Sequence, residues 1–298
     1  MKGTTIGQGL NARLSGVVLA ILVTITAGCS PTADSVNIAG VGTGGTGSTT
    51  SISGKVADGY LVGASVYLDK NGNYQLDAGE PSATTDINGA YTLNIELADL
   101  GMYPIVAMVA KGLTIDKDTN LPVENSYVLS MPKDSVSNMA DNNFISPLTS
   151  QLREMLETGT YANTQQAMDA LRTKMGLAAG TNMTSDYIAI NYTDMHAGAQ
   201  NIAAVMGNQM GQVFIANGSS TIFDVNRYRG MMGLIFSNMS TVMSANTPTE
   251  MSNLNNTMTT MMSGMPGMTI GQPYQNMSSA YRGTMWGMNS QTSWMMNR

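Results

Sequence analysis

The chain has very few of the residues from which exported proteins build disulfides and enzymes build active sites. Its 298 residues include one cysteine, Cys29, and one histidine, His196. A single cysteine excludes an intramolecular disulfide, and a single histidine leaves few parts for a Ser-His-Asp or Cys-His mechanism. No haem-attachment motif is present, and no glycine-rich nucleotide loop follows a strand-like segment. These absences predict a protein that is not an enzyme.

Charged residues are also scarce, at 11% of the chain, and acids outnumber bases. The formal charge is −6, from 14 Lys and Arg against 20 Asp and Glu. Residues 1–28 contain two bases and no acid, so their removal takes the formal charge from −6 to −8. An acidic balance of this kind argues against nucleic acid as a partner.

The first 29 residues have the pattern of an export signal. Lys2 and Arg13 accompany an apolar run at 14–25, LSGVVLAILVTI, which is too short to span a bilayer. The ITAGC sequence that ends at Cys29 resembles a bacterial lipobox, although Thr26 stands where leucine is usual. The resemblance implies acylation of Cys29 and, because serine follows it, an outer-membrane or cell-surface location. An ordinary secretory signal is the alternative.

Changes in composition and periodicity divide the chain into six segments. Short alternating runs between Asp-Gly and Asn-Gly turns predict strands, and apolar residues three and four apart predict helices. A polar composition with few branched aliphatic residues predicts disorder. The segments are a signal peptide (1–28), a Gly/Ser/Thr-rich tether (29–51), a β-sandwich (52–131), a linker (132–145), a helical region (146–245) and a Met-rich tail (246–298).

The predicted fold class is α+β: an immunoglobulin- or transthyretin-like β-sandwich, then a small helical bundle and a largely disordered tail. Four helices are expected in the bundle. The first begins at the Ser-Pro pair 146–147, and Asn163 or Thr164 caps the second. The stripe of the third reaches Phe214, and the fourth runs from about 223 to 243.

The stretch DKNGNYQLDAGE (residues 69–80) carries oxygen-bearing side chains at the spacing of a calcium loop. Calcium takes six to eight oxygen ligands, and alternate residues of a flexible loop supply them. The predicted ligands are the side chains of Asp69, Asn71, Asn73, Asp77 and Glu80 and the backbone carbonyl of Gln75. An EF-hand has glycine at the sixth position, where this loop has Tyr74, and the flanks here are strand-like. The alternative is a polar turn, since Asp, Asn and Gly dominate turns.

The segment around this loop, SGKVADGYLVGASVYLDKNGNYQLDAGEPSATTDINGAYTL, resembles a known family. Its G-x-V start, its G-A-x-V-Y-L-D run, its acidic loop closed by Glu-Pro and its T-D-x-N-G-x-Y-T hairpin are those of the transthyretin-like, carboxypeptidase-regulatory-type sandwich. They are especially similar to the calcium-binding B repeats of bacterial surface adhesins. The match covers residues 52–95 and implies calcium bound for rigidity rather than catalysis. FISPLTSQL (144–152) also resembles a segment that opens a helical region after such sandwiches in surface proteins.

Methionine is abundant, with 27 residues, of which fifteen lie from Met231 onward. Their spacing resembles the M-x-x-M patterns of periplasmic copper-handling proteins, and thioethers select soft ions such as Cu(I) or Ag(I). The predicted copper ligands are Met258, Met261, Met262, Met265 and Met268. The alternative is that these flexible side chains fill a core or form a contact surface.

The leading functional prediction is a non-catalytic lipoprotein of the cell envelope or surface with a calcium-stabilised sandwich. Its role would be adhesion, envelope structure or the binding of a protein or surface partner, with the membrane held through the lipid anchor. Two alternatives stay open. One is Cu(I) or Ag(I) binding by the Met-rich tail, and the other is service as an accessory subunit of an exported complex.

Overall fold

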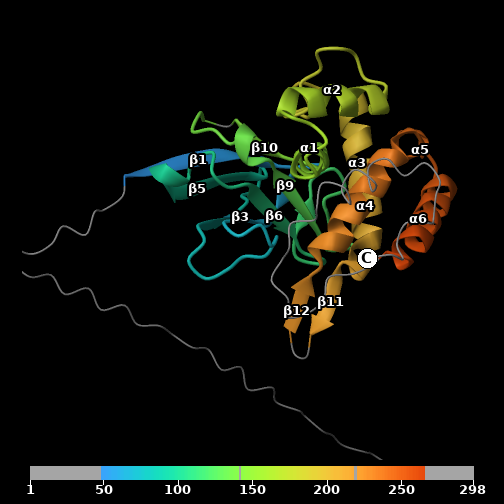
Figure 1. The fold of residues 1–298 in the computed structure, drawn as a ribbon, viewed down its shortest axis with the longest axis horizontal. Coiled ribbons are helices and arrows are strands. Elements are labelled where there is room, and N and C mark those ends of the chain that lie inside the picture. Colours follow the sequence, from blue (N-terminus) through green and yellow to red (C-terminus); the bar gives the residue numbers. More distant parts are fainter. Residues whose placement is uncertain (1–47, 141, 218–219, 266–298) are drawn as a thin grey trace, which may run out of the picture. The chain divides into compact units, whose positions relative to one another are not determined.

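Strands come first along the chain and helices follow mainly after residue 146 (Figure 1). The computed structural model describes residues 48–140, 142–217 and 220–265. The predicted signal peptide, the lipidation site Cys29, most of the tether and Met268 lie outside those residues. The α+β class predicted from the sequence is confirmed.

Twelve strands and six α-helices occur in the described ranges. The strands are β1 (Thr49–Val56), β2 (Leu61–Val62), β3 (Ser65–Leu68), β4 (Ser82–Thr84), β5 (Ala90–Glu96), β6 (Ile105–Val109), β7 (Ile115–Asp116), β8 (Leu121–Pro122), β9 (Tyr127–Met131), β10 (Asn143–Ile145), β11 (Phe214–Asn217) and β12 (Ser220–Phe223). The helices are α1 (Pro147–Glu157), α2 (Thr164–Met175), α3 (Thr193–Gln209), α4 (Val225–Ser237), α5 (Met239–Ser244) and α6 (Pro248–Ser263). Single 3₁₀ turns occur at Leu97–Asp99, Lys133–Ser135 and Met210–Gln212.

The strands form small sheets rather than one large one. The order of the largest is β4-β3-β6-β9, antiparallel throughout. A second has the order β10-β1-β5, in which β1 is antiparallel to β5 and parallel to β10. A third joins β2, β7 and β8, and β11 and β12 form a hairpin. The predicted linker 132–145 therefore ends in a strand of the second sheet, and β1 begins within the predicted tether.

Glycine at position 54 permits the parallel pairing of β1 with β10. A Cβ atom on Gly54 would lie 1.8 Å from the backbone oxygen of Asn143, so no larger residue fits. The amide of Asn143 also donates to the backbone oxygens of Ser53 and Ser137, at 2.9 and 2.8 Å. Backbone and side chain together fix β10 against the first strand.

Helix α1 is enclosed by its neighbours. Ser146 caps it, because its hydroxyl accepts from the Thr149 backbone while the Thr149 hydroxyl accepts from the Ser146 backbone. The helix contacts β9 as well as α2, α3 and α4. Its predicted apolar face is buried, but so are its polar residues Arg153 and Glu154. Only Leu156 and Glu157 at its C-terminal end are partly exposed, and the burial of Arg153 and Glu154 sets up the site described below.

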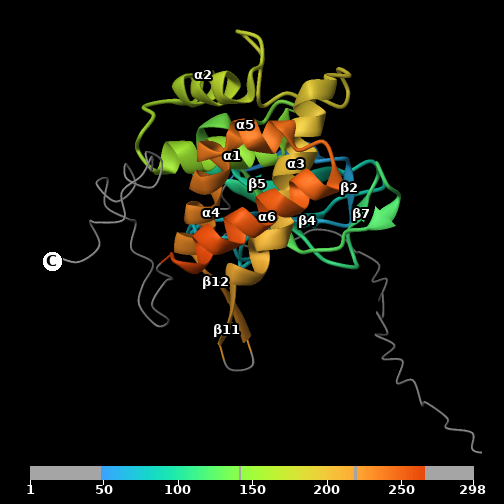
Figure 2. The ribbon, with the colours of Figure 1, turned by 90° about the vertical axis from the view of Figure 1, so that its right-hand side faces the viewer.

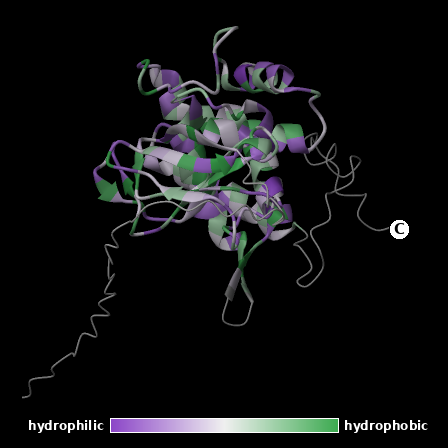
Figure 3. Ribbon diagram, turned by 90° about the vertical axis from the view of Figure 1, so that its left-hand side faces the viewer, coloured by the Kyte–Doolittle hydropathy of each residue, from purple (hydrophilic) through white to green (hydrophobic). Residues whose placement is uncertain are grey.

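Helix α2 is capped as predicted. The side-chain oxygen of Asn163 accepts from the backbone N–H of Gln166 at 3.0 Å, and Gly176 ends the helix with φ +71°. The helix is coloured largely hydrophilic in Figure 3, and few of its residues are buried. These are Ala167, Leu171, Arg172 and Met175.

Three expectations for the C-terminal half are wrong. Phe214 begins the β11–β12 hairpin, which interrupts the helical region. The predicted fourth helix is two helices, α4 and α5, which meet at Asn238. Residues 248–263 of the predicted disordered tail form α6, which crosses α3 and α4 and contacts both (Figure 2).

The strands and the helices share one hydrophobic core. Buried apolar side chains from β1 through α6 form a single cluster rather than one for each half. The strand-rich half and the helix-rich half therefore pack as one unit. This unit includes every residue from 48 onward that the structure describes. In this part of the chain, no helix has both the length and the apolar character needed to cross a membrane.

Candidate functional site: the β3–β4 loop and its buried charges

The β3–β4 loop, residues 69–80, is closed by its own hydrogen bonds. Glu80 accepts backbone N–H groups through both carboxylate oxygens, at 2.7 Å from residue 70 and 3.0 Å from Asp77. Asp77 Oδ2 accepts from the side-chain amides of Asn71 and Asn73, both at 2.7 Å. Four of the six predicted calcium ligands are therefore brought together.

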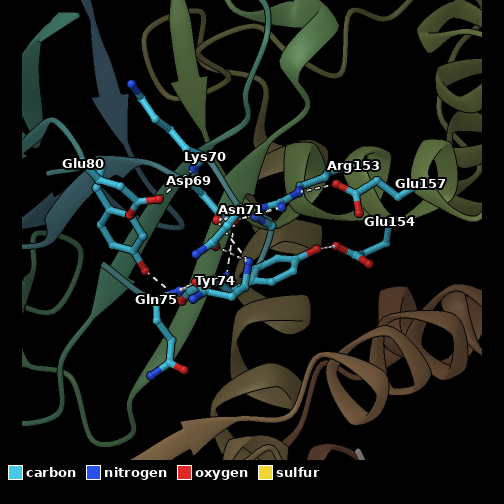
Figure 4. Close-up of polar contacts among 12 residues, drawn as sticks. Asp69, Lys70, Asn71, Tyr74, Gln75, Glu80, Arg153, Glu154 and Glu157 are labelled. Atoms are coloured by element: carbon cyan, nitrogen blue, oxygen red, sulfur yellow. Dashed lines mark hydrogen bonds and ion pairs between the residues drawn. The ribbon is translucent and has the colours of Figure 1, made fainter. Parts of the chain in front are cut away.

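Asp69, the predicted first ligand, has other partners. Its side chain is fully buried, and its Oδ1 accepts the backbone N–H groups of Gly72 and Asn73 at 2.8 and 3.1 Å. Its Oδ2 lies 3.0 Å from Nη2 of Arg153 in α1 (Figure 4). The carboxylate is thus neutralised by an arginine 84 positions later in the chain.

Tyr74 stands where an EF-hand has glycine and adopts a backbone conformation that glycine favours. Its φ is +61°, which is uncommon for a residue with a side chain. The buried ring packs on Phe223 and Tyr228, with centroid distances of 5.1 and 4.9 Å. The Arg153 guanidinium lies 3.9 Å from the ring centroid on the loop side of α1. Burial of the ring stabilises a turn that its Cβ disfavours.

Arg153 and Asp69 belong to a larger group, the buried charge cluster, which also contains Glu154 and Glu157 of α1 and Arg229 of α4. Arg153 Nε lies 2.9 Å from Glu157 Oε1, and Arg229 Nε lies 3.3 Å from Glu154 Oε2. Arg229 also pairs with Glu157. The cluster ties the loop to two helices.

The hydroxyl of Tyr74 closes the cluster by donating to Glu154 (Figure 4). Burial raises the pKa of Glu154, and the Glu157 carboxylate raises it further, while Arg229 and Arg153 oppose the rise. Burial also raises the pKa of Tyr74 well above its usual 10, so the phenol keeps its proton at neutral pH. The Tyr74–Glu154 contact therefore has a donor at every physiological pH.

Gln75, the predicted backbone ligand, has a side chain that faces away from the loop interior. Its Oε1 accepts from the backbone of Phe223 at 3.3 Å, and its Nε2 donates to the backbone oxygen of Thr221 at 3.4 Å. Both partners are in β12. The loop therefore contacts the hairpin that sequence reasoning missed.

The residues of the loop fit calcium in part. Asp77 and Glu80 form no ion pair among the described residues, and the ammonium of Lys70, in the same loop, pairs with Asp99 at 2.7 Å. Asp69 does not fit, since Arg153 already neutralises it. Residues 48–140, 142–217 and 220–265 contain no three acidic, histidine or cysteine side chains placed to hold a metal. Amide and backbone oxygens would have to complete the set.

The predicted copper ligands are divided between the core and the surface. Met258 and Met262 are fully buried on α6, whereas Met261 is 43% exposed. Met265 packs partly buried against the core, and Met268 lies outside the described residues. Three of the five thioethers thus pack in or against the core, and two of these three are fully buried.

Sequence reasoning did not find the buried charge cluster. The only signal was the i,i+4 spacing of Arg153 and Glu157, which is common on exposed helix faces. The burial of α1 on all sides, which makes these charges unusual, arises from tertiary packing. Comparisons of the chain with protein-family models, with curated proteins and with solved structures each gave no match.

Proposed function

We propose that the chain is an exported, lipid-anchored protein of the cell envelope with a structural or binding role, in which calcium at the β3–β4 loop adds rigidity. The sequence of residues 1–29 supports export and acylation at Cys29. The resemblance of residues 52–95 to carboxypeptidase-regulatory-type sandwiches supports a non-catalytic module.

One observation carries the calcium proposal. Asp77 and Glu80 share a closed loop with two amide side chains, and neither carboxylate has a cationic partner in the described structure. Asn71, Asn73, Asp77 and Glu80 would hold the ion, and its charge would relieve the repulsion between the two carboxylates. Because the Asp69–Arg153 pair joins this loop to α1, holding the loop would also stabilise the packing of strands against helices.

Thermal unfolding of the full chain tests this proposal. With a dissociation constant on the order of 10⁻³ M, as for extracellular modules, 10 mM calcium should add about 1.4 kcal/mol to the free energy of unfolding relative to EDTA. Asp77→Asn with Glu80→Gln should abolish that gain without disturbing Asp69. Asp134→Asn, at an exposed carboxylate paired with Lys133, is the matched control and should keep it.

An equal calcium effect in the double variant, or no effect in the wild type, would reduce the loop to a polar turn. The anchor is tested on the same protein by incorporation of radiolabelled palmitate, which Cys29→Ser should abolish. Labelling that persists in this variant would contradict lipidation at Cys29.

Soft-metal binding and service as an accessory subunit remain weaker proposals. The burial of Met258 and Met262 in the core favours packing over coordination for these two residues. Stoichiometric Cu(I) binding under anaerobic conditions, with a rise in melting temperature, would place soft-metal binding ahead of the structural role.

A further inference from the structure

A surface pocket of about 390 Å³ lies among the turn after β1, the β7–β8 hairpin and helix α3. Three acids from different segments line it: Asp58, Asp116 and Glu124. Apolar side chains, including Leu121, Val123 and Ala203, form other parts of the wall, and none of the described residues that line it is a lysine or an arginine. The pocket is therefore acidic at one part and aliphatic at another.

Asp58 has an incomplete set of partners. Its Oδ2 accepts from the hydroxyl of Tyr127 at 2.6 Å, and Tyr127 also lines the pocket. Its Oδ1 is buried and accepts no hydrogen bond from another described residue, and only the backbone N–H of Asp58 itself stabilises the charged carboxylate from within the residue. A buried oxygen without a donor costs about 1–3 kcal/mol, so this carboxylate is a candidate acceptor for a ligand.

Two further carboxylates crowd the same place. A Cβ on Gly59 would lie 2.3 Å from Asp116 Oδ1 and 2.6 Å from Asp118 Oδ2, so both oxygens rest against the residue that follows Asp58. Burial raises the pKa of Asp58 to about 7, and the charges of Asp116 and Asp118 contribute to the rise while Tyr127 opposes it. The local field therefore favours a cation.

The side chains of His196 and Gln200 pair with Asp118, whereas Asp116 accepts from the backbone N–H of Asp118 at 2.9 Å and from the Thr119 hydroxyl at 3.2 Å. His196 Nε2 lies 2.7 Å from Asp118 Oδ2, and Gln200 Nε2 donates to the same oxygen at 2.7 Å. Asp58, Asp116 and Glu124 have no ion pair with lysine, arginine or histidine in the described ranges. No cationic side chain of the described structure therefore offsets the charge of these three carboxylates, and a cationic ligand would do so.

We propose that this pocket binds a primary ammonium group carried on a short aliphatic chain. An ammonium has three N–H donors, which suit several carboxylate oxygens, and the aliphatic wall suits its stem. A bare metal ion suits the pocket less, because no three acidic or histidine side chains among the described residues are placed to hold one. The ammonium could come from a free amine or from a lysine side chain of another protein, and the proposal is independent of calcium at the β3–β4 loop.

Calorimetric titration of the full chain with pentylamine at pH 8 tests the proposal, with pentanol as the uncharged isostere. Pentylamine should bind and pentanol should not. Asp58→Asn and, separately, Glu124→Gln should each weaken the binding of pentylamine at least tenfold. Asp134→Asn, at an exposed residue that does not line the pocket, should leave the affinity unchanged, and a melting curve for each variant verifies folding.

Two further ligands identify the source of the ammonium. Tighter binding of a lysine-containing tripeptide than of pentylamine would assign the pocket to a protein side chain, and the reverse order would assign it to a free amine. Either order supports the proposal. Equal binding of pentanol, unchanged affinity in both pocket variants, or displacement of pentylamine by equimolar magnesium or calcium would overturn it.

Discussion

The hydroxyl of Tyr74 reaches Glu154 while its backbone shapes the β3–β4 loop, so a single residue joins that loop to a helix 80 positions later. The Tyr67 hydroxyl donates to the Tyr74 carbonyl at 2.8 Å, which fixes the same turn from the strand side. The aromatic ring takes part as well, because it contacts both the Arg153 guanidinium and the ring of Phe223. A glycine at this position would relax the backbone and keep the carbonyl that Tyr67 contacts, but it would lose the contacts of the Tyr74 ring and hydroxyl.

Tyr74→Phe isolates the contribution of the hydroxyl. The ring is kept, but Glu154 loses a buried donor, which should lower the free energy of unfolding by about 1–3 kcal/mol. Urea denaturation measures this loss. The matched control is Tyr161→Phe, because Tyr161 is partly buried and makes no side-chain hydrogen bond within the described structure. Its stability should change by less than about 0.5 kcal/mol, and equal losses in the two variants would contradict the role given to Tyr74.

Among the secondary-structure elements, α6 is a helix that the composition of its segment does not predict. Thr247 caps the helix through a box with Glu250, and Pro248 occupies the first turn. This Thr-Pro-x-Glu pattern is a helix-start signal in the sequence itself. Disorder was expected because the segment has few branched aliphatic residues, but methionine can fill a core in their place. The start of α6 is therefore visible in the sequence, and the prediction of disorder from composition is wrong for residues 248–263.

Paired substitutions on α6 test its packing. Met258→Ala should lower the free energy of unfolding by about 2–5 kcal/mol, because its fully buried side chain would leave a cavity. Met261→Ala, three residues further on and 43% exposed, should change it by less than about 0.5 kcal/mol. Chemical denaturation of both variants measures the difference. A small loss at Met258 would mean that α6 does not pack on α3 and α4.

Other elements could not be predicted from local sequence. The Ser146 and Asn163 caps were visible because a cap depends on residues three or four positions apart. Asp69 and Arg153 are 84 positions apart in the chain, so no local sequence pattern relates them. The β11–β12 hairpin is not predicted because Phe214 continues the apolar spacing of α3. The helical pattern in the sequence therefore extends beyond Gln209, where the helix ends.

Over the whole molecule, the buried charge cluster makes the strands and the helices depend on each other. Asp69 comes from the strand-rich half, and its counter-ion Arg153 comes from the first helix. Both side chains are almost completely buried. Since the hydrophobic core is also shared, neither half is expected to unfold alone.

A double-mutant cycle on this pair measures the dependence. Arg153→Met should cost about 3–5 kcal/mol, because it leaves the buried charge of Asp69 without its cationic partner. Adding Asp69→Asn should recover part of the loss, with a coupling energy of about 0.5–3 kcal/mol. The exposed Lys133–Asp134 pair is the control, with a coupling below about 1 kcal/mol.

In the wild type, far-ultraviolet and tyrosine near-ultraviolet circular dichroism should report one coincident unfolding transition. Separate transitions, or no coupling between Asp69 and Arg153, would show that the halves are independent.

The parallel pairing of β1 with β10 also bears on the timing of folding. The first strand finds this partner only when a segment 90 residues later is available, which takes roughly 5–20 s of synthesis at the usual rates of translation. Until then one edge of β1 has no strand beside it, and the shared core lacks α1. For a chain exported as proposed, the shared core would stay incomplete during this delay, which should favour passage through a membrane before folding.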